Sequence, residues 1–161
     1  MVVTSGCLVV NGGGDNMFVG EFRHNLDDKG RLIIPQKLRE KLENRLVITR
    51  GLDGCLFIYS EEEWRKISKK MEALPFESKN ARTFERFFIA GAACLEFDKQ
   101  GRVNISTSLI EYAELKKECV MLLLANRIEL WSKEKFESFL KENEESLSDV
   151  TENLFKFETN A

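Results

Sequence analysis

The stretch LDDKGRLIIP, residues 26–35, returns later in the chain as FDKQGRVNIS, residues 97–106. Three residue types recur in both copies at a shift of 71 positions: Asp27 and Asp98, Gly30 and Gly101, Arg31 and Arg102. A second similarity, residues 56–64 with 128–136, follows at a shift of 72, and a surface loop absorbs one extra residue easily. Self-similarity at a fixed spacing therefore predicts an internal duplication of one short unit.

The residues around the first copy predict a strand, a turn, a second strand and a helix. Apolar and polar residues alternate from Phe18 to Leu26, which is the period of a strand. Residues 27–30 begin with Asp and end with Gly, as turns often do. The β-branched run after Arg31 predicts a return strand, and Pro35 is suited to the first position of a helix.

The rest of the chain continues the same order. Strands are expected over residues 46–49 and 55–59, and helices begin near Ser60, which forms a capping box with Glu63, and near Ser78. The second copy repeats this with strands at 119–124 and 128–131 and with helices capped by Ser106 or Thr107 and by Ser132. The acidic tail after Glu145 is only weakly patterned, so a last helix and a loose segment both remain open.

Each unit has the order β-β-α-β-β over about 40 residues, which is too little chain to bury its own strands. We therefore expect an α+β fold in which the two units interleave in a pseudo-two-fold β core wrapped by helices. The predicted division is a flexible extension at 1–16, a first unit at 17–63, a helical connector at 64–91, a second unit at 92–135, and a C-terminal helix with an acidic tail at 136–161.

The composition limits the functional classes. The 161 residues carry a net charge of −3, with a pI near 5.4, which argues against a wholly basic nucleic-acid binder. Acidic residues concentrate near the end of the chain, so a positive face elsewhere stays possible. No run of 18 apolar residues and no secretory signal is seen, and four scattered cysteines without a C-x-x-C pair fit a reducing cytosol.

Catalysis has little support in the sequence. The single histidine, His24, lies on the apolar face of its predicted strand and is expected in the core. There is no Ser/His/Asp set, no P-loop and no G-x-G-x-x-G motif. We therefore expect no enzyme, no metal, no cofactor and no small-molecule substrate.

The repeated turn favours DNA as a partner. Arg31 offers a planar fork that fits phosphate or a guanine edge, and Lys29 adds a mobile charge beside it. A two-stranded ribbon projecting with this turn at its tip would fit the major groove. A structural alternative is equally open: Asp27 can hold the turn amides and Arg31 in a lock, which Asp98 and Arg102 would repeat. The two roles are compatible.

A second basic feature is open to two interpretations. Arg82 and Arg86 lie one helical turn apart, opposite a stripe of phenylalanines. They would suit a row of phosphate contacts, or they would form a solvated face or a contact between subunits.

At these residues the chain resembles the MraZ family of bacterial transcriptional regulators. The resemblance rests on MFVGEF at 17–22, on LDDKGR at 26–31 followed by Ile34 and Pro35, on Asp98-x-x-Gly101-Arg102, and on Glu129-Leu130-Trp131. It covers residues 17 to about 140. Residues 1–16 lie outside it, which is consistent with a start at Met17.

The resemblance implies a tandem pair of swapped-hairpin units like those of AbrB-type DNA-binding proteins. It also implies a ring of subunits that binds repeated DNA boxes upstream of the division and cell-wall genes. The DNA contacts carried over are Lys29 and Arg31, while Asp27, Gly30, Asp98, Gly101 and Arg102 would position the loops. The second copy departs from the family pattern at Asn104 and Ser106, so no DNA contact is assigned to Arg102.

The resulting hypothesis is a cytoplasmic, nucleoid-associated homo-oligomer that binds double-stranded DNA and regulates transcription. The alternative is a ring-forming protein-interaction scaffold in which the Asp/Arg loops are structural. The operator, the subunit number and the direction of regulation do not follow from the sequence.

Overall fold

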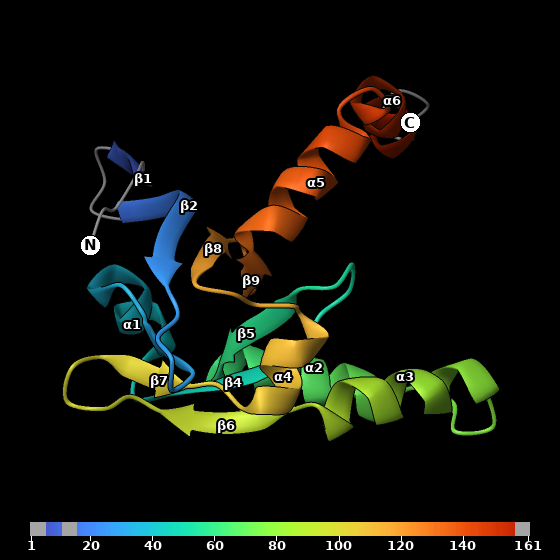
Figure 1. The fold of residues 1–161 in the computed structure, drawn as a ribbon. Coiled ribbons are helices and arrows are strands. Elements are labelled where there is room, and N and C mark those ends of the chain that lie inside the picture. The colour runs from blue at the N-terminus through green and yellow to red at the C-terminus, as the bar shows by residue number, and fades with distance from the viewer. Residues whose placement is uncertain (1–5, 11–15, 157–161) are drawn as a thin grey trace.

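The computed structural model describes residues 6–10 and 16–156, and Figure 1 shows how they are arranged. Nine strands lie in this part of the chain: β1 (Gly6–Val10), β2 (Asn16–Asn25), β3 (Arg31–Ile33), β4 (Arg45–Arg50), β5 (Leu56–Ser60), β6 (Ala93–Glu96), β7 (Arg102–Asn104), β8 (Glu118–Leu123) and β9 (Ile128–Ser132). Six helices accompany them: α1 (Gln36–Leu42), α2 (Glu61–Glu72), α3 (Lys79–Ala90), α4 (Thr107–Tyr112), α5 (Lys133–Asn143) and α6 (Leu147–Phe155). None of these helices is long and apolar enough to cross a membrane.

Seven of these strands form one antiparallel sheet in the order β1-β2-β8-β9-β5-β4-β6. The remaining two, β3 and β7, pair with each other as a separate two-stranded sheet. The strands β2 to β5 of the first copy correspond to β6 to β9 of the second. If each strand is replaced by its counterpart, the order from β2 to β6 becomes its own reverse, so the sheet has a pseudo-two-fold arrangement. The fold is thus α+β, and its strand order follows the duplication in the sequence.

Four pairs of the described strands join the two copies, while β4 pairs with β5 and β8 with β9 within one copy. The first strand of each copy pairs with the third strand of the other, so β2 lies beside β8 and β6 lies beside β4. The second strands pair as β3 with β7, and the fourth strands pair as β5 with β9. Because of this exchange, the turn after β2 is positioned by contacts with the second copy.

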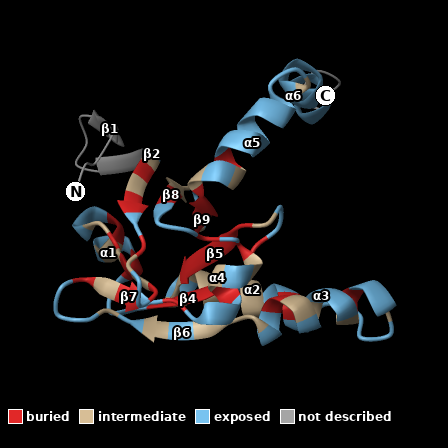
Figure 2. Ribbon diagram, in the orientation of Figure 1, coloured by how far each residue is buried: buried red, intermediate tan, exposed pale blue. Residues whose placement is uncertain are grey.

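Two apolar cores occupy opposite sides of the large sheet. Successive side chains of a strand point to opposite faces, so Leu56 and Ile58 of β5 join one core while Phe57 and Tyr59 join the other. The first core also contains the buried residues of β3, β7, α1 and α4. The second core lies under α2, α3 and α5. Figure 2 shows the burial concentrated in the strands, with α5 and α6 largely exposed.

Serine caps start four helices, as the sequence predicts. The Oγ atoms accept hydrogen bonds from the backbone amides three residues later, over 3.0 to 3.4 Å. The four serines are Ser60, Ser78, Ser106 and Ser132. Each bond satisfies an amide at the start of a helix that would otherwise have no partner. Pro35 differs from the expectation, because it is the residue before α1 and not its first helical residue.

Two expectations about the ends of the chain need correction or completion. Residues 1–16 were expected to be a flexible extension, but Gly6–Val10 forms β1, which pairs with β2. The edge of β2 offers unpaired backbone groups, and the run Cys7 to Val10 has high strand propensity. Residues 1–5 and 11–15 lie outside the described part of the chain. The open question about the tail is answered by α6.

The expectation that β2, the turn and β3 form a projecting two-stranded ribbon is wrong. After the turn, β2 and β3 share a single bridge, between Leu26 and Leu32, and then separate. Both residues are buried in the first core. The strands diverge because each finds its hydrogen-bonding partner in the other copy, so the turn rests against the body of the fold instead of projecting from it.

Candidate nucleic-acid interface

The first loop, residues 27–31, is held together by its aspartate. Asp27 Oδ1 accepts hydrogen bonds from the backbone amides of Lys29 and Arg31, each 2.9 Å long, and Oδ2 accepts one from Arg31 Nε at 2.7 Å. Backbone bonds from Asp27 N to Arg31 O and from Gly30 N to Asp27 O close the turn. Aspartate is suited to this geometry because its short side chain reaches amides two to four residues ahead.

The second loop, residues 98–102, repeats these contacts. Asp98 Oδ1 accepts from the amides of Gln100 at 2.8 Å and Arg102 at 2.9 Å, and Oδ2 accepts from Arg102 Nε at 2.8 Å. The turn is closed by Asp98 N to Arg102 O and by Gly101 N to Asp98 O. The geometry of the two loops therefore matches the lock that the sequence leaves open.

These contacts favour the ionised aspartates. The backbone amide of Arg31 is the main reason that the pKa of Asp27 lies below its ordinary value of 3.8, with help from the Arg31 side chain and the Lys29 amide. The amide of Arg102 lowers the pKa of Asp98 in the same way, with help from the Arg102 side chain and the Gln100 amide. Hydrogen bonds donated to a carboxylate stabilise its charged form.

Glycine is required where each turn meets the opposite copy. Gly30 and Gly101 both have φ of 77°, which L side chains rarely adopt. The Gly30 carbonyl accepts a bond from Ile105 N at 2.8 Å, and the Gly101 carbonyl accepts one from Ile34 N at 3.1 Å. Each loop is thus joined to the strand that leaves the other loop.

The two loops differ in the residue that covers the glycine. A Cβ at Gly30 would lie 2.9 Å from Ile105 O and 3.2 Å from Ile110 Cδ1. A Cβ at Gly101 would lie 2.5 Å from Nη1 of Arg39. Ile110 and Arg39 are equivalent in the duplication, since 110 − 39 is 71. The second loop therefore packs under a cation whose buried Nε has no hydrogen-bond partner, while the first packs under an aliphatic side chain.

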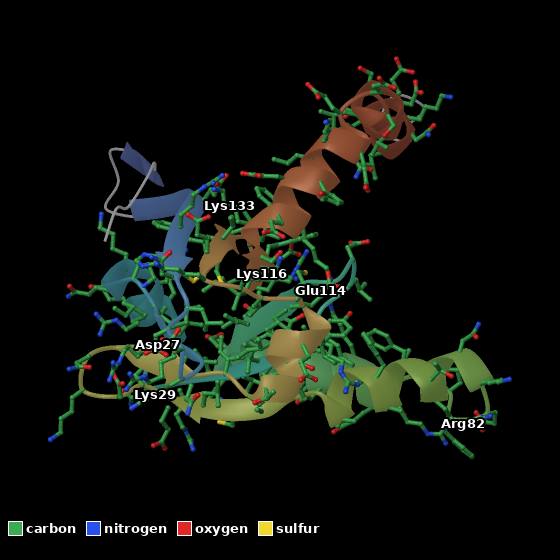
Figure 3. The ribbon with its side chains drawn as sticks, viewed as in Figure 1. Asp27, Lys29, Arg82, Glu114, Lys116 and Lys133 are labelled. Carbon is green, nitrogen blue, oxygen red and sulfur yellow. The ribbon has the colours of Figure 1, made fainter. Side chains whose placement is uncertain are left out.

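The first loop leaves hydrogen-bond donors available to a partner. Asp27 engages only the Nε of Arg31, and Arg31 makes no other side-chain hydrogen bond with the described residues. Lys29 is exposed, and no described carboxylate pairs with it. Figure 3 shows Asp27 and Lys29 together at the lower left, well away from Arg82 near the start of α3. In the second loop Gln100 takes the place of Lys29, and Lys99 takes the place of Asp28.

Of the remaining candidates, Arg82 and His24 are engaged in the fold, whereas Arg86 is exposed. Arg82 Nη1 donates to the carbonyls of Phe76 and Glu77, at 2.8 and 3.0 Å, and so fastens the connector before α3. Arg86 is exposed beside Met71 and Ile89, in an open hollow between α2 and α3. His24 is buried, as predicted, and burial lowers its pKa. The described residues contain no group of three or more His, Cys, Asp or Glu that could hold a metal ion.

Sequence reasoning missed the residues that surround the loops. Arg39 and Ile110 lie at the same 71-residue shift as the loop residues, so the alignment of the two copies could have indicated them. Lys116 and Lys117 reach the first loop only because Leu26 N bonds to Lys117 O at 2.7 Å. No periodicity in the sequence signals that contact.

Fold and loops together define a class: a tandem-repeat α+β protein that presents two turns, each with an arginine held by an aspartate. The family model described as "MraZ protein, putative antitoxin-like" matches residues 17–87 and again residues 88–158. The double match confirms the duplication.

Relatives match over most of this chain and carry one name, Transcriptional regulator MraZ. The protein of Lactobacillus helveticus (strain DPC 4571) is 54% identical over 138 residues, which are 86% of this chain and 96% of the relative. That of Halothermothrix orenii is 56% identical over 134 residues, 83% of this chain and 94% of the relative. That of Pediococcus pentosaceus is 51% identical over 141 residues, which are 88% of this chain and 99% of the relative. The chain belongs to the MraZ family, which confirms the resemblance seen in the sequence.

Proposed function

We propose that this chain is a transcriptional regulator that binds double-stranded DNA sequence-specifically through Lys29 and Arg31 of its first loop. The regulator names of the relatives support the class, and those names describe no enzyme. One observation carries the assignment to this loop. Asp27 fixes Arg31 by its Nε, while the two terminal nitrogens stay available beside an exposed lysine. A fixed guanidinium fork suits the paired acceptors of a guanine edge.

The positioning role belongs to Asp27, Gly30, Asp98, Gly101 and Arg102. Asp27 and Asp98 each take three hydrogen bonds from their own loops, and the glycines allow the close approach of the opposite copy. Arg102 has the same lock as Arg31 but lacks a neighbouring lysine at position 100. We assign Arg102 to the structure of the fold and not to DNA.

The fold proposal is finer than the sheet order. We assign the two copies to swapped-hairpin units of the AbrB type, at 17–63 and 92–135, joined by the connector at 64–91 and followed by the C-terminal region at 136–161. The pairing of β2 with β8 and of β4 with β6 supports this, since each unit completes the other. Residues 1–16 remain an extension of the first unit.

Assembly into a homo-oligomeric ring is part of the proposal. Leu147, Val150, Leu154 and Phe155 of α6 are exposed, each at 47% or more, and share one face of that helix. Such a face on a single chain favours contact with a second copy, and a contact between different surfaces closes into rings. Many copies of one loop would raise the avidity of an acidic protein for repeated DNA boxes. Leu154→Glu is expected to reduce the mass of the oligomer, while Asp149→Lys on the opposite face of α6 is not.

The function fits a cytoplasmic protein associated with the nucleoid that needs no cofactor or small-molecule substrate. Its target would be the division and cell-wall gene cluster that the family resemblance implies. The runner-up is a ring-forming interaction scaffold, and the exposed apolar face of α6 together with the identical locks in both copies favours it. In that case the loops would only hold the fold together.

Binding to DNA from upstream of the chain's own gene tests the proposal. Wild type, Arg31→Ala and Arg102→Ala are compared over a salt series against a duplex of shuffled sequence, with oligomer mass measured for each. The proposal predicts that Arg31→Ala stays assembled and loses preference for the upstream duplex, while Arg102→Ala keeps it. The scaffold would be favoured if both variants keep their preference for the upstream duplex, or if wild type shows no specific binding.

A further inference from the structure

Two open hollows adjoin beside the first loop. One, of about 310 Å³, is lined by Asn25, Lys116, Lys117, Glu118, Ser132, Lys133 and Glu134. The other, of about 500 Å³, is lined by Asn25, Leu26, Asp27, Asp28, Leu115, Lys116 and Lys117. The two hollows share Asn25, Lys116 and Lys117, and we call them together the lysine groove. It leads from the first loop along the segment before β8 to the start of α5.

The backbone fixes this groove against the first loop. Asn25 pairs with Glu118 at the end of the β2 and β8 ladder, and Leu26 N donates to Lys117 O at 2.7 Å. Leu115 is buried in the first core just before the two lysines. The lysine segment of the second copy is therefore hydrogen-bonded to the residues that enter the loop of the first copy.

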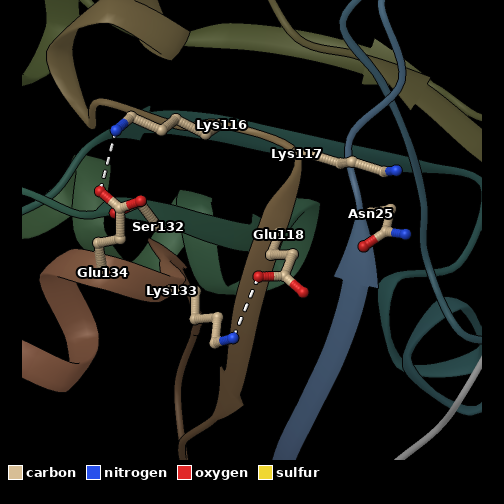
Figure 4. A pocket seen from close by; sticks show the side chains of 7 residues that line it. All are labelled: Asn25, Lys116, Lys117, Glu118, Ser132, Lys133 and Glu134. Carbon is tan, nitrogen blue, oxygen red and sulfur yellow. Dashed lines mark hydrogen bonds and ion pairs between the residues drawn. The ribbon is translucent and has the colours of Figure 1, made fainter.

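The charges in the groove are partly committed and partly available. Figure 4 shows Lys116 reaching Glu134 and Lys133 reaching Glu118, while Lys117 extends to the other side, toward Asn25. The two ion pairs are 3.0 and 3.1 Å long. The side chains of Lys116 and Glu134 are both about 70% exposed, so solvent and salt weaken their pair.

Lys117 makes the groove more basic than these pairs alone allow. It is exposed, and no described carboxylate pairs with it. The acids that face the groove are otherwise engaged, except for Asp28 at its loop end: Asp27 holds Arg31, and the two glutamates hold lysines. Asp28 lines the same hollow as Lys116 and Lys117, and it is the acid there that no described lysine or arginine holds.

The second loop has no such flank. The pairing of Asn25 with Glu118 corresponds in the other half to the pairing of Glu96 with Arg45, since 96 − 25 is 71. Glu43 and Glu114, which both have positive φ just after a helix, are also 71 apart, but Arg45 and Glu118 are 73 apart. The second copy is therefore two residues longer at this point, and the first copy, with only Asn44 between Glu43 and Arg45, has no counterpart of the Lys116-Lys117 pair. Arg45 is itself paired with Glu61 at 2.6 Å. The pair of lysines therefore flanks the first loop and has no counterpart beside the second.

We infer that the lysine groove is a phosphate-binding surface in which Lys116 and Lys117 hold the DNA backbone beside the bases that Lys29 and Arg31 contact. The inference rests on the proposed function of the first loop and extends the interface to residues of the second copy. Lysines contact phosphates as point charges and carry no base preference, so the groove contributes affinity and the loop contributes specificity.

The test is the salt dependence of binding to the upstream duplex and to the shuffled duplex. Each phosphate contact contributes about 0.9 to the slope of log affinity against log salt concentration. Lys116→Gln/Lys117→Gln is therefore expected to reduce the slope by about 1.8 for every subunit bound to DNA, and Lys117→Gln alone by about 0.9. Both duplexes lose affinity equally, so the preference for the upstream duplex is kept.

A matched control removes the same charge elsewhere. Lys69→Gln/Lys70→Gln changes two neighbouring exposed lysines of α2 and is expected to leave the slope close to that of wild type. Glu134→Gln releases Lys116 from its ion pair and should therefore increase the affinity for both duplexes. Misfolding would lower the affinity, so it could not produce this result. Oligomer mass and melting temperature are measured for every variant.

The outcomes separate this inference from the proposed function. Wild type and Arg31→Ala could behave as proposed while Lys116→Gln/Lys117→Gln shows the same salt slope as the α2 control. In that case the inference about the lysine groove is overturned, and the proposed role of the first loop is kept. If wild type shows no preference for the upstream duplex, the proposed function fails, and the inference falls with it.

Discussion

Residues 27–31 and 98–102 contain the same hydrogen bonds between an aspartate, two amides and an arginine, and the corresponding distances differ by no more than 0.1 Å. Around them little else is the same. Ile110 covers Gly30, whereas Arg39 covers Gly101. Lys116 and Lys117 flank the first loop, whereas the first copy has no such pair of lysines between α1 and β4. Duplication has kept the lock that folding uses and has let the surroundings diverge.

The largest expected effect comes from the strand pair that the two loops share. Leu32 follows the first loop, is fully buried, and lies opposite Val103, which follows the second. Leu32→Ala should reduce the free energy of unfolding by about 2–5 kcal/mol, since it opens a cavity in the core. Ile33→Ala, on the half-buried neighbour in β3, is the control. Equal effects of the two changes in denaturant unfolding would contradict the shared core.

Alanine substitutions at the two loop glycines should differ in how much they destabilise the protein. The left-handed backbone costs a non-glycine residue roughly 1–2 kcal/mol at either position. Gly30→Ala meets the carbonyl oxygen of Ile105, which belongs to the backbone and cannot easily move, whereas Gly101→Ala meets the flexible end of Arg39. We expect Gly30→Ala to destabilise the protein more than Gly101→Ala does. Melting temperatures measure the difference, and a larger decrease in melting temperature for Gly101→Ala would contradict the packing described for the two glycines.

Weakening the lock should reveal which loop has a partner. Asp27→Asn and Asp98→Asn each remove the charge that holds an arginine while keeping the shape of the side chain. The two changes should reduce stability to a similar small extent. Affinity for the upstream duplex should fall severalfold for Asp27→Asn alone, as measured by fluorescence anisotropy. An equal fall for Asp98→Asn would mean that both loops contact DNA.

The smallest expected effect is the acid response of the locks. Both aspartates have pKa values below 3.8 in the folded protein, so they contribute stability that is complete above that pH. The contribution is lost as the pH falls from about 3.8 through the lower folded pKa values. Carboxylate titration by NMR should show both aspartates titrating below their ordinary value. An ordinary pKa at either position would show that its lock is absent in solution.

The local elements of the fold were predictable from the sequence because their signals are local. Serine caps, alternation in the strands and the Asp-to-Gly turns act over a few residues, and the repeat showed that the chain contains one unit twice. Strand exchange was expected in outline from the size of each unit, but which strands pair depends on contacts between distant residues. The separation of β2 from β3 follows from that pairing and was missed.

The candidate loops were found for the same reason, and their surroundings were not. Asp27 and Arg31 lie four residues apart, so their contact follows from the turn. Lys117 and Leu26 are 91 positions apart in sequence and come together only through the β2 and β8 ladder. Exposure of the α6 face also had no sequence signal, since an apolar stripe on a helix usually indicates a buried face.

The most direct test is the structure of the assembled protein bound to the upstream duplex, determined by cryo-electron microscopy. We predict that Lys29 and Arg31 lie against base edges in the major groove, that Lys116 and Lys117 lie against the adjoining phosphates, and that residues 98–102 stay clear of DNA. A complex in which Arg102 reaches the bases, or in which the first loop faces only protein, would contradict it.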